Sequence, residues 1–199
     1  MYQEIIYARI SMKIIGFNAS PRKNGSTSFA VDHILKGAAE RGAETQLFHF
    51  GTMDIGPCRG CLACKKGDRG CILMDDMQQI YPAIEQADAL VLGAPVYMGQ
   101  MNSQAKIFVD RLFAQVSPRF SPHYKERAVK KKLVLVFTQG NPDASRFQPY
   151  YDYTRKMFEI LEFDVKDVFV VTGTRTEPAS AQTGLDTLMK RIGSALALV

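Results

Sequence analysis

Residues 12–28, with the sequence MKIIGFNASPRKNGSTS, join a short apolar run to a polar loop and decide the fold class. The run Met12–Phe17 has the length and composition of a buried strand. After the loop, apolar residues return at helical spacing: Val31, Ile34, Leu35 and Ala38. A strand that passes through a polar loop into a helix is the first half of a strand-helix-strand unit, so we expect a parallel sheet.

The alternation of strand and helix continues to the end of the chain. Four further runs predict strands: Thr45–Phe50, Ala89–Leu92, Leu133–Phe137 and Val165–Val171. Three further stripes predict helices: Phe108, Val109, Leu112, Phe113 and Val116; Tyr150, Tyr153, Met157, Phe158 and Leu161; and Leu185, Leu188, Met189, Ile192 and Leu196. The second strand alternates like a half-exposed edge strand, whereas the third and fourth are apolar throughout and should lie in the centre of the sheet.

Five strands that alternate with helices in this pattern predict an α/β fold. We expect a flavodoxin-like three-layer sandwich, with a five-stranded parallel sheet in the order 2-1-3-4-5 and helices on both faces. Ligands of such sheets bind at the carboxyl ends of the strands, here beside the first and third. Residues 12–199 should form a single domain after an N-terminal extension, residues 1–11, and Met12 is an alternative start.

The chain has 199 residues, 46% of them hydrophobic, which is enough for one domain with its own core. No apolar stretch approaches the roughly 20 residues that span a bilayer, and no cleavable leader pattern is present, so we expect a cytoplasmic protein without a membrane partner. The net charge of +5 gathers in residues 119–132, which lack aromatic interleaving. We expect a solvated loop there, or a surface that steers an anionic protein or cofactor, and no nucleic-acid partner.

The polar loop after the first strand has the chemistry of a phosphate site. Hydroxyls at Ser20, Ser26 and Thr27 can bind phosphate oxygens, and the start of the helix adds unpaired N–H groups. Arg22 or Lys23 can supply the countercharge. The alternative is a polar turn in which Ser26 caps the helix. Neither the G-x-G-x-x-G fingerprint nor Walker A is present, which favours a mononucleotide such as FMN.

A second loop follows the third strand and should face the same sheet edge. Its residues 93–100 can offer backbone donors and a flat apolar wall to a flavin ring. The candidate contacts are Pro95, Val96, Tyr97, Met98 and Gly99. A plain strand-to-helix turn is the alternative. Residues 138–142, after the fourth strand, are a third candidate wall.

All four cysteines lie in a loop at residues 57–73, spaced C-x2-C-x2-C-x6-C: Cys58, Cys61, Cys64 and Cys71. Four closely spaced thiolates can wrap around one 4Fe-4S cluster. Structural zinc is an alternative, although it usually uses two separated C-x2-C pairs. A metal-free dithiol is the third. Basic side chains that surround the cysteines would attract an acidic electron carrier: Arg59, Lys65, Lys66 and Arg69.

These residues resemble the iron-sulfur flavoproteins, within the NADPH-dependent FMN reductase-like branch of the flavodoxin fold. The resemblance runs from Met12 to about Phe113. It rests on residues 12–16 and 19–22, the four-cysteine motif, residues 75–77 and 94–99, Lys106, Asp110 and Arg111. It departs from the family at Ala19, where glycine is commoner, and in residues 139–142.

The resemblance implies noncovalent FMN, a 4Fe-4S cluster and electron transfer with an external donor. It also implies a homo-oligomer, a dimer or a tetramer, in which cluster and flavin meet across a subunit interface. By position, it assigns the phosphate contacts to Ser20, Arg22, Ser26 and Thr27, the ring contacts to residues 95–99, and the cluster ligands to Cys58, Cys61, Cys64 and Cys71. For Asp110 and Arg111, a surface ion pair or a packing role is at least as apt as a catalytic one.

We therefore expect an electron-transfer oxidoreductase that connects a one-electron carrier, such as ferredoxin, to an acceptor through FMN and the cluster. No acid, base or nucleophile is needed, and the scattered His33, His49 and His123 should be ordinary residues. One alternative is a cluster-free reductase of FMN or quinone with NAD(P)H as donor. The other is a non-catalytic binding module with a zinc-stapled loop.

Overall fold

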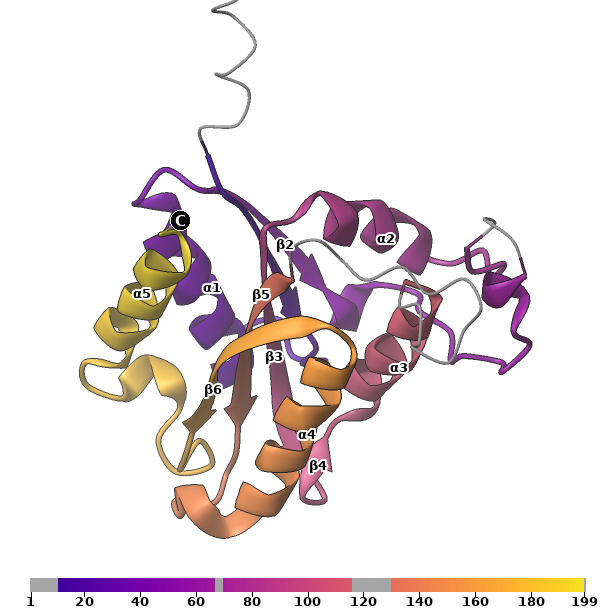
Figure 1. Ribbon diagram of the computed structural model, residues 1–199. Helices are drawn as coiled ribbons and strands as arrows, with labels where there is room; N and C mark the ends of the chain where they lie inside the picture. Colours follow the sequence, from indigo (N-terminus) through magenta and orange to yellow (C-terminus); the bar gives the residue numbers. More distant parts are fainter. Residues whose placement is uncertain (1–10, 67–69, 116–129, 199) are drawn as a thin grey trace, which may run out of the picture.

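A parallel sheet forms the centre of the protein, and the computed structural model describes residues 11–66, 70–115 and 130–198 (Figure 1). The strands along the sheet are ordered β2-β1-β3-β5-β6. Their bounds are β1 Lys13–Asn18, β2 Glu44–His49, β3 Ala89–Tyr97, β5 Lys131–Thr138 and β6 Phe163–Val171. All four neighbouring pairs are parallel. This is the predicted order 2-1-3-4-5 once β4 is set aside, and it confirms the flavodoxin-like fold.

One strand was missed. The short strand β4, Gln100–Met101, pairs antiparallel with the end of β3, as Val96 with Met101 and Tyr97 with Gln100. The predicted third strand therefore ended five residues early, because the run after Leu92 contains glycine and proline and resembles a loop. The second predicted loop is in fact a β-hairpin that extends beyond the sheet edge.

Five α-helices cover the sheet in the part of the chain that the structure describes: α1 Ser26–Ala39, α2 Met77–Gln86, α3 Ser103–Arg111, α4 Gln148–Ile160 and α5 Leu185–Leu196. Helices α1 and α5 cover one face of the sheet, and α2, α3 and α4 cover the other (Figure 1). Each face has its own apolar cluster, with Ile14, Val91 and Val136 on the first and Ile15, Leu92 and Phe137 on the second. This alternation within each strand is expected of a sheet buried on both faces.

Helix α2 was missed, since none of the predicted stripes covers it, and the stripes predicted for α4 and α5 each contain an error. In α4, Tyr153 is 67% exposed, whereas Tyr151 is buried. The helix buries Tyr151, Thr154 and Phe158, while the predicted Tyr150, Met157 and Leu161 are partly buried against the same core. In α5, Leu188 is 42% exposed, because Met189, Gly193 and Leu196 form the buried face.

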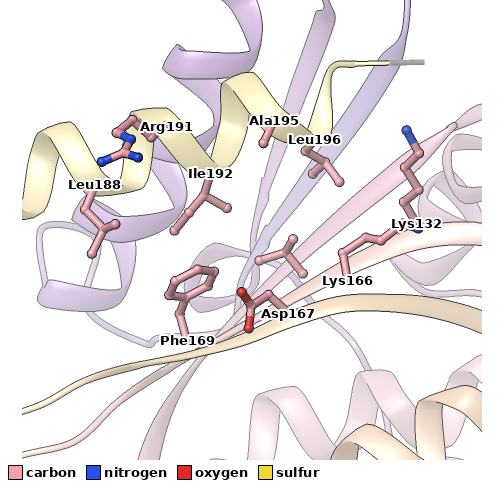
Figure 2. Close-up of a pocket in the computed structure, with 10 residues that line it drawn as sticks. Lys132, Lys166, Asp167, Phe169, Leu188, Arg191, Ile192, Ala195 and Leu196 are labelled. Carbon is pink, nitrogen blue, oxygen red and sulfur yellow. The ribbon is translucent and has the colours of Figure 1, made fainter.

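Two glycines bring α1 and α5 unusually close. A Cβ atom on Gly193 would lie 1.8 Å from the Ile34 carbonyl oxygen, and one on Gly37 would lie 2.0 Å from the Lys190 carbonyl oxygen. Beside α5, a pocket of about 450 Å³ lies over β5 and β6 (Figure 2). It is lined by Lys132, Val134, Lys166, Asp167, Phe169, Leu188, Arg191, Ile192, Ala195 and Leu196. None of these residues belongs to the predicted cofactor loops.

Several predictions concern segments outside the described residues. These are the N-terminal extension up to residue 10, Arg69, Val116, His123 and most of the basic stretch at 119–132. Within the described end of that stretch, the Lys131 ammonium donates to the carbonyl oxygens of Glu85 and Ala87, at the end of α2. A cation at a helix carboxyl end is stabilising, which accounts for this lysine without a ligand. No helix among the described residues is long and apolar enough to cross a membrane.

Candidate functional site

The phosphate loop follows β1, at the carboxyl edge of the sheet. The N-cap residue of α1 is Gly25, which brings no side-chain cap, so the alternative in which Ser26 caps this helix is wrong. The first N–H groups of α1 are therefore open to an anion. The Ser20 hydroxyl accepts a 3.1 Å hydrogen bond from the Arg22 N–H, and its own proton remains available to donate.

The loop also forms one wall of a polar pocket of about 340 Å³. Its lining combines the start of α1 with a segment from the far end of the chain: Arg22, Lys23, Asn24, Gly25, Ser26, Ser28, Phe29, Asp32, His33, Thr174, Pro178 and Ser180. The Ala179 N–H donates to the Ser26 hydroxyl at 3.1 Å and ties the two segments together. Residues 174–180 were not predicted near this loop, because no local sequence pattern shows that they return to α1.

Of the four predicted phosphate contacts, Thr27 has its hydroxyl paired with another strand end. It is 2% exposed, and its hydroxyl lies 2.7 Å from that of Thr138, at the end of β5. The Thr27 side chain thus joins the predicted phosphate loop to the third predicted wall, and this contact helps to position the phosphate loop. Of the other predicted contacts, Arg22 and Ser26 line the pocket, whereas Ser20 is 2% exposed and does not.

The hairpin turn consists of Met98 and Gly99, with φ angles of 50° and 82°. Two positive φ angles in a two-residue loop are the mark of a type I′ turn, where Asn-Gly is preferred and methionine is unusual. The Met98 side chain is fully exposed and Tyr97 is 44% exposed, so both are open to a ligand or another chain. The Met101 N–H donates to the Tyr150 hydroxyl at 3.1 Å, which braces the hairpin against α4.

The hairpin and the phosphate loop are joined by Asn102, which sequence reasoning missed. Its amide nitrogen donates to the Ala19 carbonyl oxygen at 2.7 Å, and its backbone N–H donates to the Pro95 carbonyl oxygen. The Asn102 Oδ1 atom and the Asn18 Nδ2 atom are both buried without a hydrogen-bond partner. Unpaired buried polar atoms are costly. Their presence beside both predicted loops fits a polar cofactor such as FMN at this edge.

The third wall, residues 138–142, contains Gln139, whose side chain is fully engaged within the protein. Its amide nitrogen donates to the carbonyl oxygens of Asn141 and Asp143, and its Oε1 atom accepts a 2.5 Å hydrogen bond from Tyr151. Burial raises the pKa of Tyr151 to about 12, so this hydroxyl stays protonated at neutral pH. Gln139 therefore shapes the loop, and only the following residues are exposed to a ligand.

The four cysteines lie on one loop between β2 and α2. Cys58 and Cys61 are exposed, Cys64 and Cys71 are half-buried, and all four are free thiols. Gly60 and Leu62 have positive φ angles of 62° and 57°, which turn the chain between successive cysteines. This donor set fits an iron-sulfur cluster. Among the residues that the structure describes, however, no three Cys, His, Asp or Glu side chains lie close enough to share a metal ion.

The basic residues around the cysteines do not all face solvent. The Lys65 ammonium donates to the Phe113 carbonyl oxygen and lies 4.3 Å from the centre of the Phe113 ring. Burial lowers the pKa of Lys65, and burial also raises the pKa of the neighbouring Cys64 thiol. Lys65 therefore anchors the loop. The proposed attraction of an acidic carrier then depends on Arg59 and Lys66, which are exposed.

The neck of the cysteine loop contains a buried ion pair. Arg111, at the end of α3, binds the Asp75 carboxylate through two bonds of 2.5 and 3.0 Å. Although burial by itself would raise the pKa of Asp75, hydrogen bonds from Arg111 and from the N–H groups of Gly56 and Met77 hold it below its usual value. The adjacent Asp110 instead pairs with Lys106 on the helix surface. Asp110 thus forms the expected surface ion pair, whereas Arg111 has a buried structural role.

Three comparisons place the chain among known proteins. It is 38% identical over 100 residues to an iron-sulfur flavoprotein of Methanocaldococcus jannaschii and 39% identical over 100 residues to an iron-sulfur flavoprotein of Methanosarcina thermophila. These alignments cover 50% of this chain and 51% and 52% of the relatives, so the chain matches about half the length of these curated relatives. Among solved structures, an NAD(P)H:quinone oxidoreductase from Methanothermobacter marburgensis superposes with a TM-score of 0.74 at 17% identity.

That superposition covers 95% of this chain and 98% of the other, and it shows a shared fold. The profile of one protein family, described as NADPH-dependent FMN reductase, matches residues 12–163. This range contains the phosphate loop, the hairpin, the cysteine loop and the third wall. The chain therefore belongs to the NADPH-dependent FMN reductase family.

Proposed function

We propose that the protein is a flavin oxidoreductase that holds FMN at the carboxyl edge of the sheet and a 4Fe-4S cluster on the cysteine loop. The main support for the FMN site is that hydrogen bonds connect three loops at one edge of the sheet. Ala19 N–H donates to the Gly93 carbonyl oxygen at 2.9 Å, Asn102 binds Ala19, and Thr27 binds Thr138. Such a constellation is typical of a ligand site at the switch point of a parallel sheet.

In this proposal, Ser20, Arg22 and Ser26 bind the phosphate together with the N–H groups at the start of α1. Residues 95–99 form a wall beside the ring, with Tyr97 and Met98 as its apolar part. Bound FMN would exchange electrons one or two at a time. The residues of the site bind and orient the cofactor, and none of them needs to transfer a proton as a general acid or base.

Cys58, Cys61, Cys64 and Cys71 are the proposed cluster ligands, supported by their spacing and by the two iron-sulfur flavoproteins that share half of the chain. A bound cluster would pass single electrons. Two molecules of a one-electron carrier, of the ferredoxin kind, each lose one electron. The acceptor gains both electrons, and a quinone would also take up two protons from water.

We also propose a homo-oligomer. The hairpin tip exposes Tyr97 and Met98, and the cysteine loop exposes Leu62, Ile72 and Met74, the last of which is 89% exposed. Exposed apolar side chains on both loops are suited to a contact between subunits. Sedimentation of the purified protein should therefore give a mass that is a multiple of 22.2 kDa, whereas a monomer at all concentrations would overturn this part of the proposal.

The experiment that tests the electron route is anaerobic reduction of the flavin, followed by its absorbance. Wild type and the Cys61→Ser variant are each mixed with reduced ferredoxin or with NADPH. The proposal requires ferredoxin to reduce the flavin in wild type and to fail in the variant, while FMN content stays equal. Equal reduction of both proteins by ferredoxin would overturn the route through the cysteines.

A second candidate is a reductase that uses NAD(P)H and no cluster. The family description favours it, because that family is named for NADPH and FMN. Among the described residues, no three of the cysteines lie close enough to share a metal ion, which is compatible with a cluster-free reductase. Rapid bleaching of the flavin by NADPH, at equal rates in wild type and Cys61→Ser, would establish this second candidate.

A further inference from the structure

Helix α3 connects the two proposed cofactor loops. It begins at Ser103, directly after the hairpin, and ends at Arg111, where it meets the cysteine loop. At its amino end, Asn102 binds the phosphate loop through Ala19. A helix of this length spans about 13 Å and bends little. The same rigid element therefore contacts both the flavin edge and the cysteine loop.

At the carboxyl end of α3, Arg111 binds both ends of the cysteine loop, Gly56 before it and Asp75 after it, which together form its neck. Its guanidinium donates to the Gly56 carbonyl oxygen at 2.8 Å and to the Asp75 carboxylate. Gly56 lies two residues before Cys58, and Asp75 lies four residues after Cys71. The Gly56 N–H also donates to Asp75 at 3.0 Å, which closes the neck. The Arg111 side chain is 1% exposed, so water does not compete for these bonds.

Residues at and just after the end of α3 also contact the interior of the cysteine loop. Lys65, beside Cys64, binds the Phe113 carbonyl two residues after Arg111. The Tyr81 hydroxyl exchanges hydrogen bonds with Arg111, as acceptor from Nε at 3.3 Å and as donor to the carbonyl oxygen at 3.2 Å. Tyr81 lies on α2, so these bonds fix the Arg111 guanidinium against a second helix.

We propose that Arg111 is a positioning residue, which closes the neck of the cysteine loop through Gly56 and Asp75 and is itself held in place by Tyr81. The claim that Arg111 helps to hold a cluster rests on the proposed function. The claim that Arg111 orders the cysteine loop does not depend on it. Lysine cannot replace this arginine, because the bidentate contact with Asp75 and the separate contacts with Gly56 and Tyr81 need a planar, branched donor.

The first test uses the protein without a cluster. Arg111→Lys is compared with wild type and with Arg155→Lys, a matched control. Arg155 also binds a carbonyl oxygen, that of Val165, and lies 4.0 Å from Glu159, far from the cysteines in sequence. Trypsin cleavage after Lys65 and Lys66 should be at least about tenfold faster in Arg111→Lys alone, because loop opening limits cleavage. Equal rates in all three proteins would overturn the ordering role.

The second test follows anaerobic reconstitution with iron and sulfide. Arg111→Lys should bind less than about half of the wild-type iron at unchanged FMN content, since the loss of one oriented partner commonly costs tenfold or more in metal affinity. Tyr81→Phe removes only the hydroxyl that bonds to Arg111. It should also bind less iron than wild type at unchanged FMN content, and its loop should be cleaved faster by trypsin, because Arg111 loses the partner that holds it.

The outcomes separate the inference from the proposed function. If wild type binds iron and both variants match it in iron content and cleavage rate, the positioning role is wrong and the cluster stands. If wild type binds no iron but Arg111→Lys is cleaved faster, the cluster proposal is wrong and the ordering role stands. If Arg111→Lys does not fold, as judged by FMN content, the trypsin cleavage rate and the iron content of Tyr81→Phe decide: values equal to wild type overturn the positioning role.

Discussion

The side-chain amide of Asn102 lies 2.7 Å from the carbonyl oxygen of Ala19, 83 residues earlier in the chain. This hydrogen bond joins the end of the hairpin to the start of the phosphate loop, and both partners are buried. It fixes the spacing between the two loops before any cofactor arrives. Preorganisation of this kind favours binding, because less ordering remains for the ligand to impose.

Substitution of Asn102 by alanine should therefore weaken FMN binding. The Ala19 carbonyl would lose its buried donor, at a cost of about 1–3 kcal/mol in the free energy of unfolding. We expect the FMN dissociation constant to rise by about tenfold or more, measured by flavin fluorescence. The neighbouring exposed Ser103→Ala is the control and should change neither quantity. Unchanged affinity in Asn102→Ala would show that the loops do not need this contact.

The hairpin tip predicts a gain in stability. Met98 has a φ of 50°, a left-handed conformation that costs a residue with a Cβ atom about 1–2 kcal/mol and that asparagine tolerates. Met98→Asn should raise the melting temperature by about 2–4 °C. FMN binding should weaken at the same time, because Met98 is part of the proposed apolar wall. Met74→Asn, at another exposed methionine without this backbone strain, should not raise the melting temperature.

The Asp75–Arg111 pair predicts how stability depends on pH. The pKa of Asp75 is held below its usual value, so its contribution is fully present above about pH 4, the unfolded pKa, and is lost as pH falls toward the folded value. Asp75→Asn should lower the free energy of unfolding by about 3–5 kcal/mol at neutral pH. The difference between the two proteins should shrink below about pH 4 in urea denaturation. A difference that stays constant down to pH 2 would contradict this assignment.

The contact between α1 and α5 gives a test in which two effects have opposite signs. Helix propensity alone predicts that Gly193→Ala stabilises the protein by about 1 kcal/mol. The added Cβ would lie 1.8 Å from the Ile34 carbonyl, however, so we expect a net loss of about 1–3 kcal/mol. Ser194→Ala, which removes one hydrogen bond to Gly37, should cost only about 1 kcal/mol. A stabilised Gly193→Ala protein would mean that the helices are not this close.

The sequence was sufficient for the sheet order, because buried parallel strands are short apolar runs and right-handed crossovers leave few topologies. It was also sufficient to place a polar loop between β1 and α1, since a strand, a polar loop and a helix follow one another without interruption. The type I′ hairpin was missed because Met98 occupies a position where Asn is expected. A glycine and a proline before it concealed the continuation of β3.

The contacts that assemble the site could not be predicted, because they join residues distant in sequence. Nothing near Ser26 indicates Ala179, and nothing near Thr27 indicates Thr138. The same holds for Arg111, whose buried partner Asp75 lies in another element, while the adjacent Asp110 offers an equally plausible partner for a surface pair. The direction in which Lys65 points, toward Phe113 rather than solvent, also depends on the packed structure.

The most direct test of the account is the cofactor content of the protein after anaerobic purification. FMN, iron, sulfide and zinc are quantified for each chain, together with an absorption spectrum. The account predicts about one FMN, about four iron ions and about four sulfides per chain. FMN without iron or sulfide, even after anaerobic reconstitution, would contradict the two-cofactor claim and leave a cluster-free flavin reductase. Zinc without flavin would contradict the account as a whole.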